Sequence, residues 1–163
     1  MPDYNDRLRK NEKNPLFDYG GRKPPRDTDL EEAVLGALML EKDAYTTVCD
    51  ILKPESFYEP SSQKIYEAIQ ALGASQRPID MLTVTEQLRI NGTLADVGGP
   101  VYISELTSRV ASGAHVEFHA RIVAQKYLAR ELIKFSSAIE SKAFDESNDV
   151  DDLLQEAEGR LFE

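Results

Sequence analysis

Tryptophan, cysteine and long apolar runs are scarce or missing in this sequence of 163 residues. It contains no tryptophan and one cysteine, Cys49, which excludes an internal disulfide and any metal site built from several thiolates. No apolar run approaches the roughly 18 residues of a membrane-spanning helix, and the N-terminal region has no apolar segment like that of a secretory signal. We therefore expect a cytoplasmic protein that makes no contact with a membrane.

Motifs for nucleotide hydrolysis and catalysis are also missing. No G-x-x-x-x-G-K-[ST] segment is present to cradle phosphates. His115 and His119 have the spacing that zinc sites use on a helix, but no third ligand is evident and Glu117 would point to the other side. Cys49 has no His–Asp pattern nearby and is expected to be buried as a small apolar residue. We expect this chain to have no catalytic residue, no bound cofactor and no metal.

Charge is unevenly distributed along the chain. The 19 basic and 29 acidic residues give a net charge of −10, which disfavours binding to phosphate backbones. Residues 1–26 are the exception, because they carry seven basic and four acidic side chains, four of the eight prolines and few aliphatic residues. Such a segment buries too little apolar surface to offset its ordering entropy, so we interpret residues 1–26 as a flexible basic arm.

Helical signals dominate residues 27–112, where no segment alternates with the period of two that strands show. Polar capping residues precede apolar residues at helical spacing. The residues expected to begin five helices are Asp27 to Asp29, Asp43, Ser61 or Ser62, Asp80 and Pro100. On the fourth helix, Leu82, Val84 and Leu88 are expected to face the core, while Gly36 in the first indicates either a close helix contact or simple tolerance. These features predict an all-α fold with a compact multi-helix globule over residues 27–112.

Residues 113–163 predict a long αα-hairpin. No proline or glycine occurs from His115 to Ala143, which as a helix would be about 43 Å long, and a second helix is expected from Val150 to Leu161 after a polar turn. The apolar stripe of the long helix exceeds what the second can cover, so we expect the hairpin to pair with a second copy of the chain. The alternative is a hairpin that folds back on the globule. The residues expected to form the self-association interface are Val123, Tyr127, Leu128, Leu132, Phe135, Ile139, Leu154 and Leu161.

Five segments carry the most specific signal in the sequence. They are EEAVLGALML (31–40), ILKPESFYEPSSQKIYEAI (51–69), RPIDMLTVTEQL (77–88), GTLADVGGPVYISEL (92–106) and EFHARIVAQKYLARELI (117–133). In this order and spacing, the chain from about Asp27 to Glu163 resembles the N-terminal domain of DnaB-type bacterial replicative DNA helicases. The family often has a histidine where Ser62 stands, so a role tied to that histidine is not expected here.

The resemblance implies a division of labour within a longer protein. In the family, an all-α globule and a helical hairpin form the N-terminal domain, paired hairpins make dimers, and three dimers form a collar on the hexameric ring. The collar docks the C-terminal domain of the primase and, in some systems, a helicase loader. ATP, Mg²⁺ and DNA are bound by a RecA-like domain that this sequence does not contain and that drives 5′→3′ unwinding. The resemblance therefore implies a non-catalytic part of a helicase that works in the bacterial cytoplasm, at replication forks of the nucleoid.

Two other interpretations stay open at this stage. Residues 80–110 contain short helices separated by glycines, as in a helix-turn-helix DNA-binding regulator, but they offer few base-contacting side chains. Those side chains are Gln87, Arg89, Asn91 and Arg109. The second alternative is a free-standing helical adaptor with no helicase half.

Overall fold

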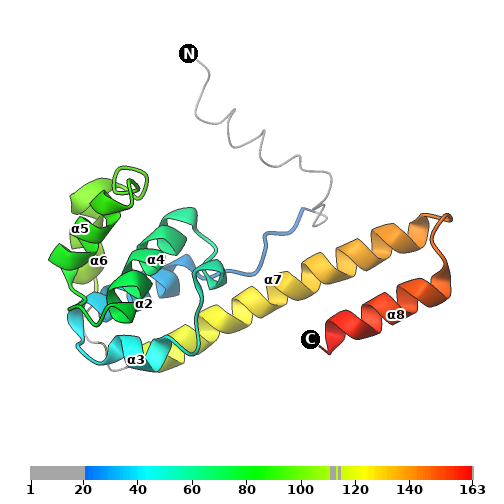
Figure 1. The fold of residues 1–163 in the computed structure, drawn as a ribbon, viewed down its shortest axis with the longest axis horizontal. Helices are drawn as coiled ribbons and strands as arrows, with labels where there is room; N and C mark the ends of the chain where they lie inside the picture. Colours follow the sequence, from blue (N-terminus) through cyan, green and yellow to red (C-terminus); the bar gives the residue numbers. More distant parts are fainter. Residues whose placement is uncertain (1–20, 111–112, 114, 163) are drawn as a thin grey trace, which may run out of the picture. The chain divides into compact units, whose positions relative to one another are not determined.

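The computed structural model describes residues 21–110, 113 and 115–162. All regular elements within these residues are helical, which confirms the all-α prediction (Figure 1). They are α2 (Thr28–Leu40), α3 (Ala44–Val48), the 3₁₀ helix η1 (Pro54–Ser56), α4 (Pro60–Ala74), α5 (Met81–Ile90), α6 (Gly99–Ser108), α7 (Val116–Phe144) and α8 (Val150–Leu161). Two compact units are distinguished, one spanning Pro25–Leu128 and the other including the chain from Ala129 onward. The predicted arm lies mostly outside the described residues, because these begin at Gly21.

Two of the predicted helix starts are confirmed by side-chain caps. The Asp27 carboxylate accepts a hydrogen bond from the N–H of Leu30 at 3.0 Å. Asp80 accepts from the N–H groups of Leu82 and Thr83, both at 2.9 Å. Because the first N–H groups of a helix have no partner within it, such carboxylates fix where each helix begins.

One of the predicted helix starts is wrong, and another is confirmed without a side-chain cap. Helix α4 begins at Pro60 after Glu59, not after either of the two serines that follow, since proline at the first helical position gives up no hydrogen bond. Ser62 is instead buried inside this helix. Helix α3 begins after Asp43, as predicted, although no side-chain cap bond is formed there.

The core of the Pro25–Leu128 unit is built where α2, α4, α5 and α6 pack against one another. Its largest fully buried side chains are Tyr66, Phe57, Leu35, Leu38, Leu52 and Ile65. The Tyr66 hydroxyl donates to the carbonyl oxygen of Leu52 at 2.9 Å, and burial raises the pKa of Tyr66 above its ordinary value. Gly36 lies where α2 meets α6 at a distance that excludes a side chain. Of the two interpretations of this glycine, a close helix contact is confirmed.

One carboxylate is part of this core. Glu31, in the first turn of α2, is only 1% exposed. Its oxygens accept hydrogen bonds from the backbone N–H of Tyr58 at 3.0 Å and of Glu59 at 3.3 Å. The carboxylate therefore ties the first turn of α2 to the segment that leads into α4.

Two predictions of burial are wrong. Leu82 is 74% exposed, because it precedes the buried Val84 by two residues and so lies about 200° around the helix from it. Cys49 is exposed at the end of α3, where its neighbour Val48 faces the core instead. In both cases the helix buries the face that its neighbours reach, and the remaining apolar residue faces solvent.

The first turns of α7 belong to the core of this same unit. Val116, Ala120 and Val123 are buried in the core cluster, so the unit extends to Leu128, past the boundary expected at residue 112. Val123 was expected at a self-association interface, but it is 2% exposed within a single chain. The prediction for Val123 is wrong, because a residue enclosed by its own core has no surface to offer a second copy.

The other unit contains the end of α7 and all of α8, which runs back beside it (Figure 1). Lys142 on α7 forms an ion pair with Glu156 on α8, and the Asn148 side chain donates to the backbone carbonyl of Lys142 at 3.0 Å. Helix α8 is amphipathic, yet none of its residues is classed as buried. No helix among the described residues is long and apolar enough to cross a bilayer.

Candidate protein-interaction surfaces

Exposed leucines mark the hairpin formed by α7 and α8. Leu128 and Leu132 on α7 are 59% and 50% exposed, and Leu154 and Leu161 on α8 are 57% and 60% exposed. Large apolar side chains in water cost free energy that a protein partner can recover by covering them. These four leucines, named here the hairpin leucines, are the part of the predicted interface that remains open in a single chain.

Three further residues of the predicted interface are partly buried. Tyr127, Phe135 and Ile139 are intermediate in exposure. Phe135 and Ile139 follow Leu132 at offsets of three and seven residues, which places them on the same face of α7. The structure therefore groups Leu132, Phe135 and Ile139 along one stripe of the helix.

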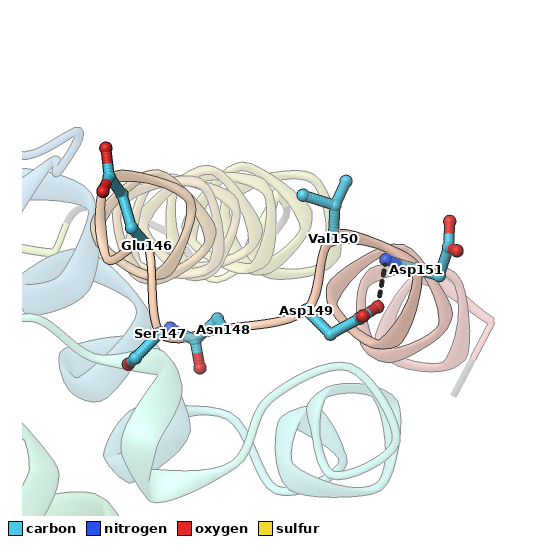
Figure 2. A pocket seen from close by; sticks show the side chains of 6 residues that line it. All are labelled: Glu146, Ser147, Asn148, Asp149, Val150 and Asp151. Carbon is cyan, nitrogen blue, oxygen red and sulfur yellow. Dashed lines mark hydrogen bonds between the residues drawn. The ribbon is translucent and has the colours of Figure 1, made fainter.

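The turn between α7 and α8 is held by its own side chains, and Figure 2 shows one of these bonds, from the N–H of Asp151 to Asp149. Asp145 accepts from the hydroxyl of Ser147 at 2.7 Å and from its N–H at 3.0 Å. Asp149 caps α8 by accepting from the N–H groups of Asp151 and Asp152 at 2.9 and 3.2 Å. These bonds fix the turn, so α8 is directed back along α7 by local chemistry.

Two carboxylates of the hairpin have lowered pKa values. Hydrogen bonds from the Ser147 side chain and backbone hold the pKa of Asp145 below its ordinary value. The side-chain hydrogen bond from Lys142, with the charges of Lys142 and Arg160, lowers the pKa of Glu156. Both carboxylates therefore stay charged at neutral pH and contribute to the acidic character of this end of the chain.

A second apolar surface lies between α5 and α6 in the other unit. A shallow groove of about 440 Å³ is bounded by Met81, Leu82 and Thr85 on α5 and, on α6, by Pro100, Val101, Ser104, Glu105 and Ser108. Val101 on α6 is 70% exposed and corresponds to Leu82 on α5. Each of the two stands two residues before the first buried residue of its helix. The apolar spacing of α5 predicts that Leu82 faces the core, so the sequence gives no sign of this groove.

The side chains that a helix-turn-helix protein would use to contact bases form ion pairs or hydrogen bonds within this chain. Arg89 pairs with Glu86, and the Gln87 amide donates to the side-chain oxygen of Asn91 at 2.9 Å. Arg109 pairs with Glu32 at 2.6 Å, close to the half-buried Tyr102. These contacts do not favour a helix-turn-helix regulator, whose recognition helix must present free donors to base edges.

The two histidines lie near each other at the start of α7. The ring centroids of His115 and His119 are 6.3 Å apart in an edge-on arrangement. Within the described part of the chain, no group of three or more His, Cys, Asp or Glu side chains is arranged to hold a metal ion.

Comparison with known proteins identifies the family. The family described as "DnaB-like helicase N terminal domain" matches residues 23–125. The replicative DNA helicase DnaB of Rhodothermus marinus is 45% identical over 147 residues, which is 90% of this chain and 16% of the relative. The replicative DNA helicase DnaC of Bacillus subtilis is 38% identical over 142 residues, covering 87% of this chain and 31% of the relative. The chain thus spans a third or less of the length of these curated relatives.

Solved structures of the same family have the same fold as this chain. The N-terminal domain of DnaB helicase from Mycobacterium tuberculosis superposes with a TM-score of 0.80 at 34% identity, covering 86% of this chain and 99% of that one. A DnaB-like replicative helicase, described together with its interactions with primase, superposes with a TM-score of 0.69 at 25% identity, covering 83% of this chain and 31% of that one. The chain belongs to the family of DnaB-like helicase N-terminal domains.

Proposed function

We propose that this chain is the non-catalytic N-terminal part of a replicative DNA helicase, where it joins subunits through its hairpin and receives the primase. The observation that carries the proposal is the set of hairpin leucines, which a single chain leaves in water. In a family of helicase N-terminal domains, such a surface is best used to bring subunits together.

Self-association would cover the hairpin leucines. Charged residues lie beside the apolar stripe on α7, among them the ion-paired Glu131 and Lys134. An apolar centre with a charged edge is the usual anatomy of a protein interface. The proposed assembly is a pair of hairpins related by a twofold axis, with three such pairs forming the collar of a hexamer.

Primase docking is the second part of the proposal. The similar helicase of known structure is described with its interactions with primase, and we propose the same partner here, through the C-terminal domain of the primase. A helicase loader is a further proposed partner of the same collar. The net charge of −10 fits a protein-binding role better than DNA binding, which depends on neutralising phosphates.

ATP and Mg²⁺ are expected to bind elsewhere in the parent helicase, because the 163 residues of this chain contain no G-x-x-x-x-G-K-[ST] segment. We propose that the parent helicase binds ATP, Mg²⁺ and DNA through residues outside this sequence, and that this chain contributes assembly and docking.

The primase proposal is tested by titration calorimetry with the purified chain. The C-terminal domain of the primase from the same organism is expected to bind, whereas the catalytic core of that primase serves as the control and is expected not to bind. A lack of heat and of co-elution at tens of micromolar of both proteins would refute primase docking. An ATPase assay of the same sample is expected to show no activity that scales with the concentration of the chain.

A further inference from the structure

The groove between α5 and α6 is not used by the hairpin or by the core. Its walls are two packed helices of the Pro25–Leu128 unit. Leu82 and Val101 project from these walls and are 74% and 70% exposed, while Met81 is partly exposed beside them. We propose that this groove binds an amphipathic helix of a partner protein, one whose apolar face is flanked by basic side chains.

The shape of the groove favours a protein segment over a small molecule. Pockets for small ligands enclose most of the ligand surface, but here the apolar residues of the walls are themselves mostly open to water. A helix laid along the groove would cover Leu82 and Val101 together without needing an enclosed cavity. The open groove thus matches the way amphipathic helices are recognised.

The composition of the groove argues against two other common modes of peptide recognition. An added strand needs a sheet edge, and both walls here are helices. A proline-rich segment needs aromatic side chains to dock on, and the groove is lined by Met, Leu, Val, Pro, Thr, Ser and one Glu, with no aromatic residue. A helix with apolar anchors is the mode that remains.

The negative charge at the groove favours basic side chains on the flanks of the proposed helix. Glu105 is the one charged side chain in the lining, and no basic residue lines the groove. The Arg109 guanidinium lies 3.8 Å from the Glu105 carboxylate but 2.6 Å from that of Glu32, so Glu32 is its closer partner. Because the chain as a whole carries −10, a lysine or arginine beside the apolar face is attracted and an acidic one is repelled.

The test uses two synthetic helical peptides and the whole chain. Both peptides carry leucines along one face, one flanked by lysines and the other by glutamates, and binding is followed by fluorescence anisotropy and by amide chemical shifts of the labelled protein. We expect the lysine peptide to bind more tightly and to shift amides of α5 and α6. Equal affinities, shifts confined to α7 and α8, or no binding of the lysine peptide at millimolar concentration would overturn the proposal.

Variants separate the groove from other apolar surfaces. Leu82→Ser is expected to weaken binding of the lysine peptide by about tenfold, since it removes most of one buried leucine from the contact. Ile90→Ser is the matched control, because Ile90 is also on α5 and is 66% exposed but does not line the groove. It should change the affinity less than about twofold, as expected of a residue outside the contact. Unfolding midpoints of both variants show whether the fold is retained.

The charge and the occupant are tested in the same way. Glu105→Gln is expected to weaken the lysine peptide about threefold and to reduce the salt dependence of its binding, as for other charges at the edge of an interface. If Leu82→Ser instead lowers the sedimentation mass of the chain, the groove is occupied by a second copy and the proposed partner helix is wrong.

Discussion

A methyl group placed on Gly36 would lie 2.3 Å from the carbonyl oxygen of Leu106. The same methyl would lie 2.5 Å from a side-chain carbon of Val110. Both distances are shorter than atoms tolerate, and one of the two neighbours is backbone that cannot rotate away. The crossing of α2 and α6 therefore depends on this glycine, despite its cost to the helix itself.

Gly36→Ala is expected to lower the stability of the chain. Overpacking of a close contact costs about 1–3 kcal/mol, which outweighs the gain of up to about 1 kcal/mol from replacing glycine in a helix. Gly159 in α8 is the control, because nothing lies within 4 Å of the position of an added methyl. Urea unfolding should show a lower free energy of unfolding for Gly36→Ala and no decrease for Gly159→Ala. Equal effects of the two substitutions would mean that α2 and α6 are not in close contact.

Glu31→Ala should be among the more damaging substitutions of an acidic residue. It leaves the N–H groups of Tyr58 and Glu59 without this acceptor inside the protein, and lost hydrogen bonds to a charged group cost about 1.5–3 kcal/mol each. Glu67 on α4 is exposed, and Glu67→Ala is expected to stay within about 0.5 kcal/mol of the natural protein. Thermal unfolding of the two variants measures the difference, and a Glu31→Ala protein as stable as the control would contradict the structure.

Alkaline pH is expected to reveal the buried hydroxyl of Tyr66. Because the pKa of Tyr66 is raised in the folded chain, the unfolded chain loses this proton first as the pH rises past about 10. The stability that this residue provides is complete below that pH and falls above it. Tyr66→Phe removes the hydrogen bond to the carbonyl oxygen of Leu52. Its free energy of unfolding at neutral pH should therefore be lower by about 1 kcal/mol. Its free energy of unfolding should then decline less steeply between pH 9 and 11, and parallel curves would count against the assignment.

Local chemistry explains why much of the fold could be predicted. The caps at Asp27 and Asp80 depend on neighbours within a few residues, and both are confirmed. The two helices of the hairpin could also be predicted, because the long stretch without proline or glycine and the polar turn after it are features of the sequence.

Long-range packing explains what could not be predicted. The acceptor role of Glu31 depends on backbone 27 residues away, and no spacing in the sequence signals it. Leu82 and Val123 were misassigned for a related reason: apolar spacing shows which residues share a helix face, but not which face another element will cover. The groove between α5 and α6 could not be predicted for the same reason, because one of its walls carries Leu82.

Self-association through the hairpin is the central claim, and Leu132 is the residue on which to test it. Its side chain is 50% exposed in the single chain, so a charge there is tolerated in a monomer but not at a dry interface, where an unpaired charge costs several kcal/mol. Leu40, on α2 and 52% exposed, provides a matched leucine away from the hairpin.

Sedimentation equilibrium of the natural chain, Leu132→Glu and Leu40→Glu, at concentrations up to tens of micromolar, is the most direct measurement. The natural chain and Leu40→Glu are expected to sediment as dimers or larger assemblies, while Leu132→Glu sediments as a monomer with unchanged helicity by circular dichroism. A natural chain that stays monomeric throughout this range, or a Leu132→Glu chain that associates as strongly as the natural one, would contradict assembly through the hairpin.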